Sequence, residues 1–149
     1  MPRKLLKLRN ASEELQDYVA FNSGLGYVVG GITGNFTIGQ IFDWEDAKRL
    51  LGEKVLLTLY DNGHTFYHTG GQKILEKSWR FVAKGSTANQ ALDRARDIET
   101  WLLNKRQFTT ETFQFWFVDE VRSPAVVARG ENGSHLAETI LRGFVISRV

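Results

Sequence analysis

The 149-residue chain contains no cysteine, only two prolines and one methionine. Without cysteine it has no disulfide, no thiolate nucleophile and no cysteine-rich zinc site. No run of 18 apolar residues occurs, so we expect no membrane-spanning helix. The basic first ten residues are not followed by an apolar core, so we also expect no signal peptide.

The overall composition is typical of a folded globular protein. Apolar residues make up 42% of the chain, with ten phenylalanines and four tryptophans. The length predicts a single domain, residues 1–149, that is large enough to bury a hydrophobic core. We find no internal repeat and no low-complexity segment.

The charges are unevenly distributed. The first ten residues hold four of the 19 basic side chains and no acidic one, so the rest of the chain carries 15 basic and 17 acidic side chains. The body therefore lacks the charge of a nucleic-acid-binding surface. The basic start either contacts phosphate or an acidic partner, or is a solvated segment that leads into a helix. Its basic residues are Arg3, Lys4, Lys7 and Arg9.

Residues 79–104 predict a strand, a polar turn and one long amphipathic helix at about 87–104. Thr87 followed by Gln90 has the form of a capping box. The apolar stripe of the helix consists of small and aliphatic residues at steps of three and four, Ala88, Ala91, Leu92, Ala95, Ile98 and Leu102. The opposite side is predicted to carry Asp93, Arg94, Arg96, Asp97 and Glu99.

Two strands are predicted after this helix, an aromatic-rich one at 112–118 and a mainly aliphatic one at 137–149. Both have apolar residues at alternating positions on each side, so we expect both strands to be covered on two faces. The segment 119–129, which contains Pro124, is predicted to be a connection. Cover on two faces requires a packing partner on the face that the long helix does not reach, and a neighbouring subunit is one possible source.

The first part of the chain predicts a short helix at 11–21 and a strand at 25–29. The glycine-rich residues 30–40 are interpreted as a flexible loop or as a hairpin with Phe36 at its tip. A second short helix is predicted at 43–51.

A strand at 54–60 is predicted to end at the turn Asp61-Asn62-Gly63 and to return at 65–68. A further strand follows at 74–84. Together these elements predict an α+β fold, with a mixed, mainly antiparallel sheet on which the long helix and the N-terminal helix pack.

No catalytic or cofactor-binding motif emerges from the sequence. His64 and His68 are four residues apart and close to Asp61, but a zinc site needs a further ligand that no spacing indicates, so a polar hairpin is the simpler interpretation. Asp119 and Glu120 are adjacent, and adjacent residues of a strand point to opposite faces. We therefore expect no enzyme activity, no metal and no cofactor.

The order of elements from residue 79 to the C-terminus resembles the phage tail terminator proteins, a family also described as tail-to-head joining or minor capsid proteins. The resemblance lies in the strand WRFVAKG, the helix TANQALDRARDIETWL and the aromatic strand after it. It continues through the loop RSPAVVARGENG and the terminal strand ILRGFVISRV. A short N-terminal helix also fits the family.

This resemblance implies a structural virion protein at the head–tail junction, assembled in the host cytoplasm. Such proteins form a ring, usually a hexamer, on the last ring of tail tube protein and offer an attachment surface to head-completion, or neck, proteins. DNA only passes through the opening, and no membrane is involved. A closed ring needs two different, mutually complementary patches on each subunit.

We expect the loops and aromatic side chains to make these contacts. Phe36, Trp44 and Trp116 are the aromatic candidates, although for Trp116 we expect a place in the core. The other predicted interface residues are polar or charged, His64, His68, Asp119, Glu120, Arg122 and Arg129.

Three other interpretations remain open at this point. The first is a different head–tail connector protein, an adaptor or a stopper. The second is a small metal-binding or ligand-binding domain that uses the two histidines. The third is a nucleic-acid-binding module that uses the basic start, for which salt-dependent binding to duplex DNA would be diagnostic.

Overall fold

The computed structural model of the chain describes residues 11–26, 28–29, 37–40, 54–69, 72–130 and 133–148, and for residues 28–73 it describes only the backbone. Two helices are described, α1 (Ala11–Asn22) and α3 (Ala88–Lys105). The strands are β1 (Val28–Val29), β2 (Thr37–Gln40), β3 (Lys54–Thr69), β4 (Gln72–Gly85), β5 (Gln107–Thr109), β6 (Phe113–Arg129) and β7 (His135–Ser147). The predicted helix at 43–51 lies outside the described residues, as do Arg3, Lys4, Lys7, Arg9, Phe36 and Trp44.

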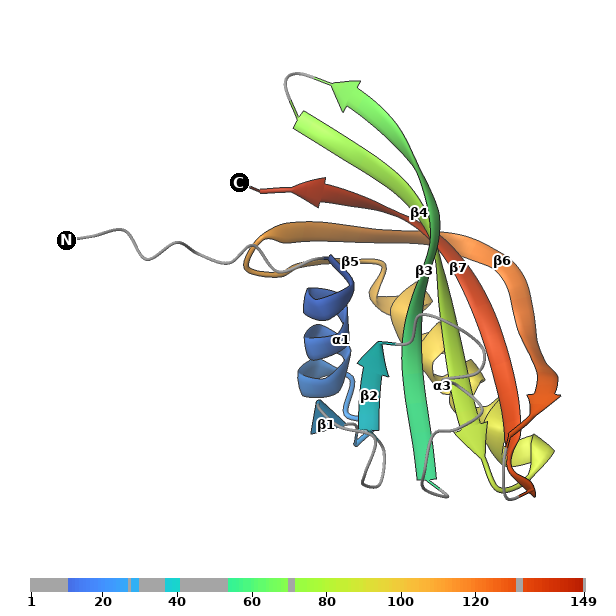
Figure 1. Cartoon of the computed structure of the whole chain (residues 1–149). Coiled ribbons are helices and arrows are strands. Elements are labelled where there is room, and N and C mark those ends of the chain that lie inside the picture. Colours follow the sequence, from blue (N-terminus) through green and yellow to red (C-terminus); the bar gives the residue numbers. More distant parts are fainter. Residues whose placement is uncertain are drawn as a thin grey trace.

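The strands form one mixed sheet in the order β1-β2-β3-β4-β7-β6-β5. The pairs β1–β2 and β2–β3 are parallel, and the pairs β3–β4, β4–β7, β7–β6 and β6–β5 are antiparallel. Figure 1 shows that the long strands twist and bend about halfway along their length. The predicted α+β fold with a mainly antiparallel sheet is confirmed.

Helix α3 begins where its capping residues predict. The Thr87 side chain accepts a hydrogen bond from the backbone N–H of Gln90 at 3.1 Å. The Gln90 side chain accepts one from the backbone N–H of Ser86 at 2.8 Å, one residue before the expected capping-box partner. Gly85 allows the close approach of this turn, because a Cβ there would lie 2.6 Å from the backbone nitrogen of Ala91.

The apolar stripe of α3 packs on β4, β6 and β7. Four of its six residues are buried, whereas Ala88 and Leu92 are half-buried. The placement of Arg94 on the solvent side was wrong. Arg94 is buried, and its guanidinium donates a hydrogen bond to the Lys84 carbonyl at 2.9 Å, which satisfies part of the buried charge.

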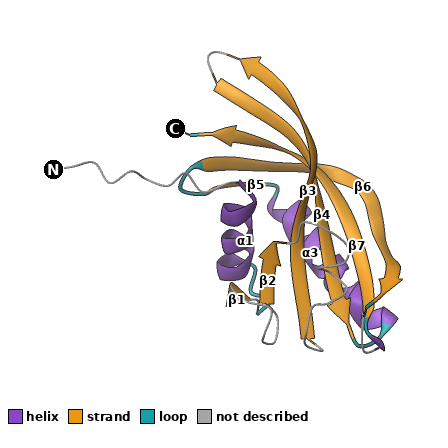
Figure 2. Ribbon diagram, viewed as in Figure 1, coloured by secondary structure: helices purple, strands orange, loops and turns teal. Residues whose placement is uncertain are grey.

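One hydrophobic core joins both helices to the sheet. Figure 2 shows where the two helices and the strands lie. Leu15 and Val19 of α1 belong to it. Phe108 of β5 connects α1 to the sheet. The centroid of its ring lies 3.9 Å from that of Tyr18 of α1 and 5.2 Å from that of Phe115 of β6, and both ring pairs are stacked. Within the described part of the chain, no helix is long and apolar enough to cross a membrane.

The predicted turn at Asp61-Asn62-Gly63 was wrong. β3 continues through it to Thr69 and pairs with β4 on both sides, with a register shift between Asp61 and His64. Asparagine and glycine favour a β-bulge as well as a turn, and a full-length partner strand selects the bulge. The chain reverses instead between Thr69 and Gln72.

The predicted connection at 119–129 was also wrong, because these residues extend β6. They pair with β7 through several register shifts, one of which spans Pro124. β5 pairs only with residues 114–116 of β6, so this later part of β6 has a single described partner. Proline is tolerated there since its missing N–H falls at a bulge on an edge strand.

The parallel pairing of β2 corrects the interpretation of residues 30–40. Thr37–Gln40 form a strand that runs parallel to β1 and β3, so this part is neither a loop nor the return arm of a hairpin. Of the strand predicted at 25–29, only Val28–Val29 are in β1.

Candidate functional site

The two faces of the sheet differ sharply along β4, β6 and β7. The helix face contacts α3 and carries buried residues such as Trp79, Phe115 and Leu141. We call the other side the opposite face. Along β7 it carries Arg142, Phe144 and Ile146, all half-buried, whereas Leu141, Gly143 and Val145 of the helix face are buried. Cover on both faces is thus complete only toward the start of β7, where residues 136–140 are all buried.

Trp116 is the most prominent apolar side chain of the opposite face. It lies beside Phe144, with ring centroids 6.3 Å apart and planes at 57°. The expectation that Trp116 lies in the core was wrong, since 45% of it is exposed while its neighbour Phe115 is fully buried. Strand alternation predicted opposite faces for these two residues but not which face the chain itself would cover.

A buried carboxylate lies on the same face, farther toward the start of β7. The Glu138 side chain is 2% exposed and sits between two guanidinium groups. Arg122 of β6 donates to it at 2.6 Å, and Arg80 of β4 approaches its other oxygen at 3.2 Å as an ion pair. A buried carboxylate needs such partners to remain charged.

A second ion pair links the middle of the three strands. Arg142 of β7 holds Asp119 of β6 with two hydrogen bonds of 3.0 Å, and it lies 3.5 Å from Glu76 of β4. The hydrogen bonds that Arg142 donates to Asp119 raise the pKa of its guanidinium. Asp119 and Arg122 thus lie on β6 with partners in the chain, and not on the connection predicted for residues 119–129.

Glu99 of α3 and Glu120 of β6 share a hydrogen bond at the border of the helix face. Burial, followed by this hydrogen bond, raises the pKa of Glu99 from 4.5 to about 7, while the hydrogen bond from Thr139 opposes the shift. The bond with Glu99, followed by one from Ser123, lowers the pKa of Glu120. The two carboxyl groups therefore hold one proton between them at mildly acidic pH.

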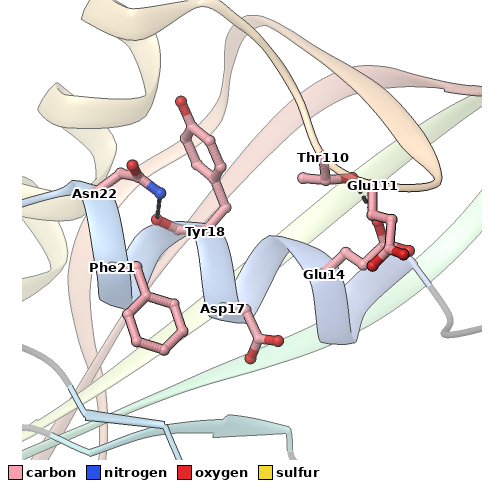
Figure 3. Close-up of a pocket in the computed structure, with 7 residues that line it drawn as sticks. All are labelled: Glu14, Asp17, Tyr18, Phe21, Asn22, Thr110 and Glu111. Atoms are coloured by element: carbon pink, nitrogen blue, oxygen red, sulfur yellow. Dashed lines mark hydrogen bonds between the residues drawn. The ribbon is translucent and has the colours of Figure 1, made fainter.

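An acidic pocket lies between α1 and the turn that joins β5 to β6 (Figure 3). Its volume is about 210 Å³. Three carboxyl side chains line it, together with one phenyl ring, one phenol, one amide and one hydroxyl. The lining residues are Glu14, Asp17, Tyr18, Phe21, Asn22, Thr110 and Glu111. We call the pocket lined by these seven residues the acidic pocket.

Glu14 fixes the wall of the acidic pocket. One of its oxygens accepts hydrogen bonds from the Thr110 hydroxyl at 2.6 Å and from the Thr112 backbone N–H at 2.8 Å. These bonds attach α1 to a turn that is almost a hundred residues away in sequence. The other oxygen is buried, and among the described residues it has no hydrogen-bond partner.

The histidines predicted as a possible metal site lie on β3, where Lys77 is opposite His64 and Lys73 is opposite His68. In the part of the chain that the structure describes, no group of three or more histidine, aspartate or glutamate side chains could hold a metal ion. Arg129 lies at the end of β6, opposite His135. The structure thus gathers Asp119, Glu120 and Arg122 on one strand, away from the acidic pocket.

Sequence reasoning missed the acidic pocket and the pair of Glu99 with Glu120. Neither has a local signal, because Glu14 and Glu111 come from segments that meet only in the folded chain. The alternation of charged and apolar residues in 137–147 was a usable signal for the opposite face, since Glu138 and Arg142 share the side of Ile140 and Phe144.

Comparison with known proteins adds no relative. No protein-family model matches the chain, and no curated protein matches it.

Proposed function

We propose that the protein is a structural subunit of a phage tail, a tail terminator that forms a ring on the end of the tail tube and offers a surface to head-completion proteins. The proposal starts from the resemblance of residues 79–149 to that family. The observation that carries it further is the partial exposure of Trp116, Phe144 and Ile146 on the opposite face.

Exposed aromatic side chains beside charged ones are characteristic of protein interfaces. Tryptophan and arginine are enriched at the positions that dominate binding energy. Here Trp116 lies two register rows from the ion pair of Arg142 with Asp119, on the same face of the sheet, so a partner that covers the ring would also lie near these charges. A neighbouring copy or the tube protein fits such a mixed surface.

A ring also requires a second, different patch on each subunit. We assign this second patch to the acidic pocket, because its residues come from α1 and the β5–β6 turn and not from the opposite face. One copy can thus present the opposite face to one neighbour while its acidic pocket faces the next.

The decisive experiment is a mass measurement of the purified protein, alone and after mixing with tubes assembled from the tube protein of the same genome. We expect rings alone or rings on tube ends, visible by native mass spectrometry and by electron microscopy. A protein that stays strictly monomeric and ignores tube ends contradicts the proposal.

A variant sharpens the test. Trp116→Ala should reduce ring formation or tube binding, since it removes the largest exposed side chain of the opposite face. Val121→Ala, also on β6 and also exposed, is the matched control. Equal loss in both variants would argue against a specific contact at Trp116.

A further inference from the structure

Carboxyl and hydroxyl groups meet at the border between α3 and the later part of β6. Glu99 of α3 contacts both Glu120 of β6 and Thr139 of β7. Thr139 donates a hydrogen bond to Glu99 at 2.5 Å, and Ser123 of β6 donates one to Glu120. Two carboxylates in hydrogen-bond contact repel each other unless one of them carries a proton. The contact between α3 and β6 is therefore favourable only while the pair holds that proton.

The Thr139 hydroxyl couples this pair to the backbone of β6. Its oxygen lies 2.5 Å from a Glu99 carboxyl oxygen and 3.2 Å from the Arg122 carbonyl oxygen. A hydroxyl group has one proton to donate, so it serves one of these two acceptors at a time. A charged carboxylate is the stronger acceptor, whereas a neutral carboxyl group leaves the proton to the carbonyl. Loss of the proton from Glu99 therefore also removes a hydrogen bond from the backbone of β6.

Residues 120–126 are the part of β6 that such a change can move. Register shifts against β7 lie between Glu120 and Arg122 and between Arg122 and Ala125. Pro124, inside the second of these shifts, has no N–H to donate. Among the described strands, β7 is the only one that pairs with this segment, since β5 pairs with an earlier part of β6. A segment with so few ladder hydrogen bonds opens more readily than the rest of the sheet.

Other charged groups have less influence on Glu99 than Glu120 has. Among the described residues, the charged or titratable groups on the facing sides of α3 and its cap, β4, β6 and β7 are Arg96, Arg106, Lys77, Arg129 and His135. Arg96 lowers the pKa of Glu99, but its effect is smaller than those of burial and of Glu120. Burial, followed by the bond with Glu120, therefore decides that Glu99 is the member of the pair that takes up the proton.

We propose that Glu99, Glu120 and Thr139 form a proton-controlled latch between α3 and the later part of β6. The latch is closed when Glu99 is protonated, and it releases residues 120–126 when Glu99 is charged. In the closed state Glu99 donates to the Glu120 carboxylate, and Thr139 is free to donate to the Arg122 carbonyl. In the open state two like charges face each other, and the exposed Glu120 turns toward water. The two ion pairs of β6 on the opposite face are unaffected, so the opening stays local.

Hydrogen–deuterium exchange of the full chain at pH 6 and pH 8 tests the latch. The labelling times are corrected for the faster intrinsic exchange at the higher pH. We expect the protection of the backbone amides in residues 120–126 to fall about tenfold between the two pH values, because Glu99 titrates at about 7 in the closed state and at 4.5 in the open state. Peptides from α3 and β7 should keep their protection. No fall, or an equal fall in every peptide, would overturn the proposal.

Two variants assign the effect to one carboxyl group. Glu99→Gln removes the charge but keeps a hydrogen-bond donor toward Glu120, so residues 120–126 should be equally protected at pH 6 and pH 8. Asp97→Asn removes a carboxylate from an exposed position of the same helix and should retain the fall of about tenfold. A fall in Glu99→Gln as large as in the parent chain would overturn the latch, because the pH dependence would then come from another group.

An NMR titration of the glutamate carboxyl groups provides a check on the unmodified chain, whether or not the variants fold. We expect Glu99 to titrate with a midpoint near its pKa of about 7 and Glu120 to titrate below its ordinary range. A Glu99 midpoint near 4.5 would overturn the latch. These outcomes are separate from the tube experiment, because the latch acts within a single chain.

Discussion

The helix face and the opposite face of the sheet are stabilised by different interactions. On the helix face, α3 excludes water from Phe115, Leu141 and Val145, and apolar burial stabilises the contact. On the opposite face the chain uses ion pairs, and an aromatic ring stays partly exposed. The comparison indicates that apolar burial is concentrated on the helix face, while the described side chains of the opposite face include charged pairs and a partly exposed ring.

The largest contrast should come from two adjacent residues of β6. Phe115→Ala should reduce the free energy of unfolding by about 3–5 kcal/mol, because it leaves a cavity under α3. Trp116→Ala should cost less than about 1.5 kcal/mol, since 45% of the residue is already exposed. Urea unfolding followed by circular dichroism measures both. Similar losses would mean that the two faces do not differ.

The next effect concerns the charge buried on the opposite face. Glu138→Gln should cost about 2 kcal/mol, because two guanidinium groups lose their carboxylate in a buried position. Asp119→Asn removes the partner of Arg142 in a more exposed pair and should change stability little, and less in high salt. Unfolding midpoints at low and high salt separate the two cases.

A smaller effect should appear at the start of α3. Thr87→Ala removes the acceptor for the Gln90 N–H and should cost about 1 kcal/mol. Thr100→Ala, at an exposed position within the same helix, is the control and should be neutral or slightly stabilising. If Thr87→Ala has no effect, packing on the sheet alone holds the first turn of the helix.

The smallest effect should be a change in the pH dependence of stability. Glu99 has a raised pKa in the folded protein, so the folded state binds more protons than the unfolded state between pH 4.5 and about 7. The contribution of Glu99 to the free energy of unfolding is therefore fully present below pH 4.5 and is lost as the pH rises toward 7. Glu120, whose pKa is lowered, contributes in the opposite sense and reduces the net effect.

The variant Glu99→Gln isolates this contribution. We expect it to gain stability relative to the parent as the pH rises from 5 to 7.5, which urea titrations at several pH values would measure. A constant difference across this range would show that the pair of Glu99 with Glu120 does not share a proton.

Local patterns were reliable where one segment both forms an element and defines its buried side. The 3.6-residue period of α3 correctly predicted Ala91, Ala95, Ile98 and Leu102 as buried. It misplaced Arg94, because the carbonyl that accepts its hydrogen bond belongs to β4. Asp61-Asn62-Gly63 failed for a similar reason, since only the partner strand decides between a turn and a bulge.

The candidate sites were predictable to a smaller extent. Alternation along 137–147 and 112–118 placed the right residues on common faces. It could not tell which face the chain covers, so Trp116 was assigned to the core. The acidic pocket was beyond prediction, since Glu14 is almost a hundred residues from Thr110 and Thr112 in the sequence and contacts them only in the folded chain.

The sequence by itself determined the α+β class, the long helix with its cap and the apolar stripe, and the alternation of the last strands, because these depend on the periodicity of neighbouring residues. Only the tertiary structure decided the length of β3 and β6, the pairing of Glu99 with Glu120, the exposure of Trp116 and the acidic pocket. Each of these depends on which distant segment supplies hydrogen bonds, charge or cover, and no local pattern carries that information.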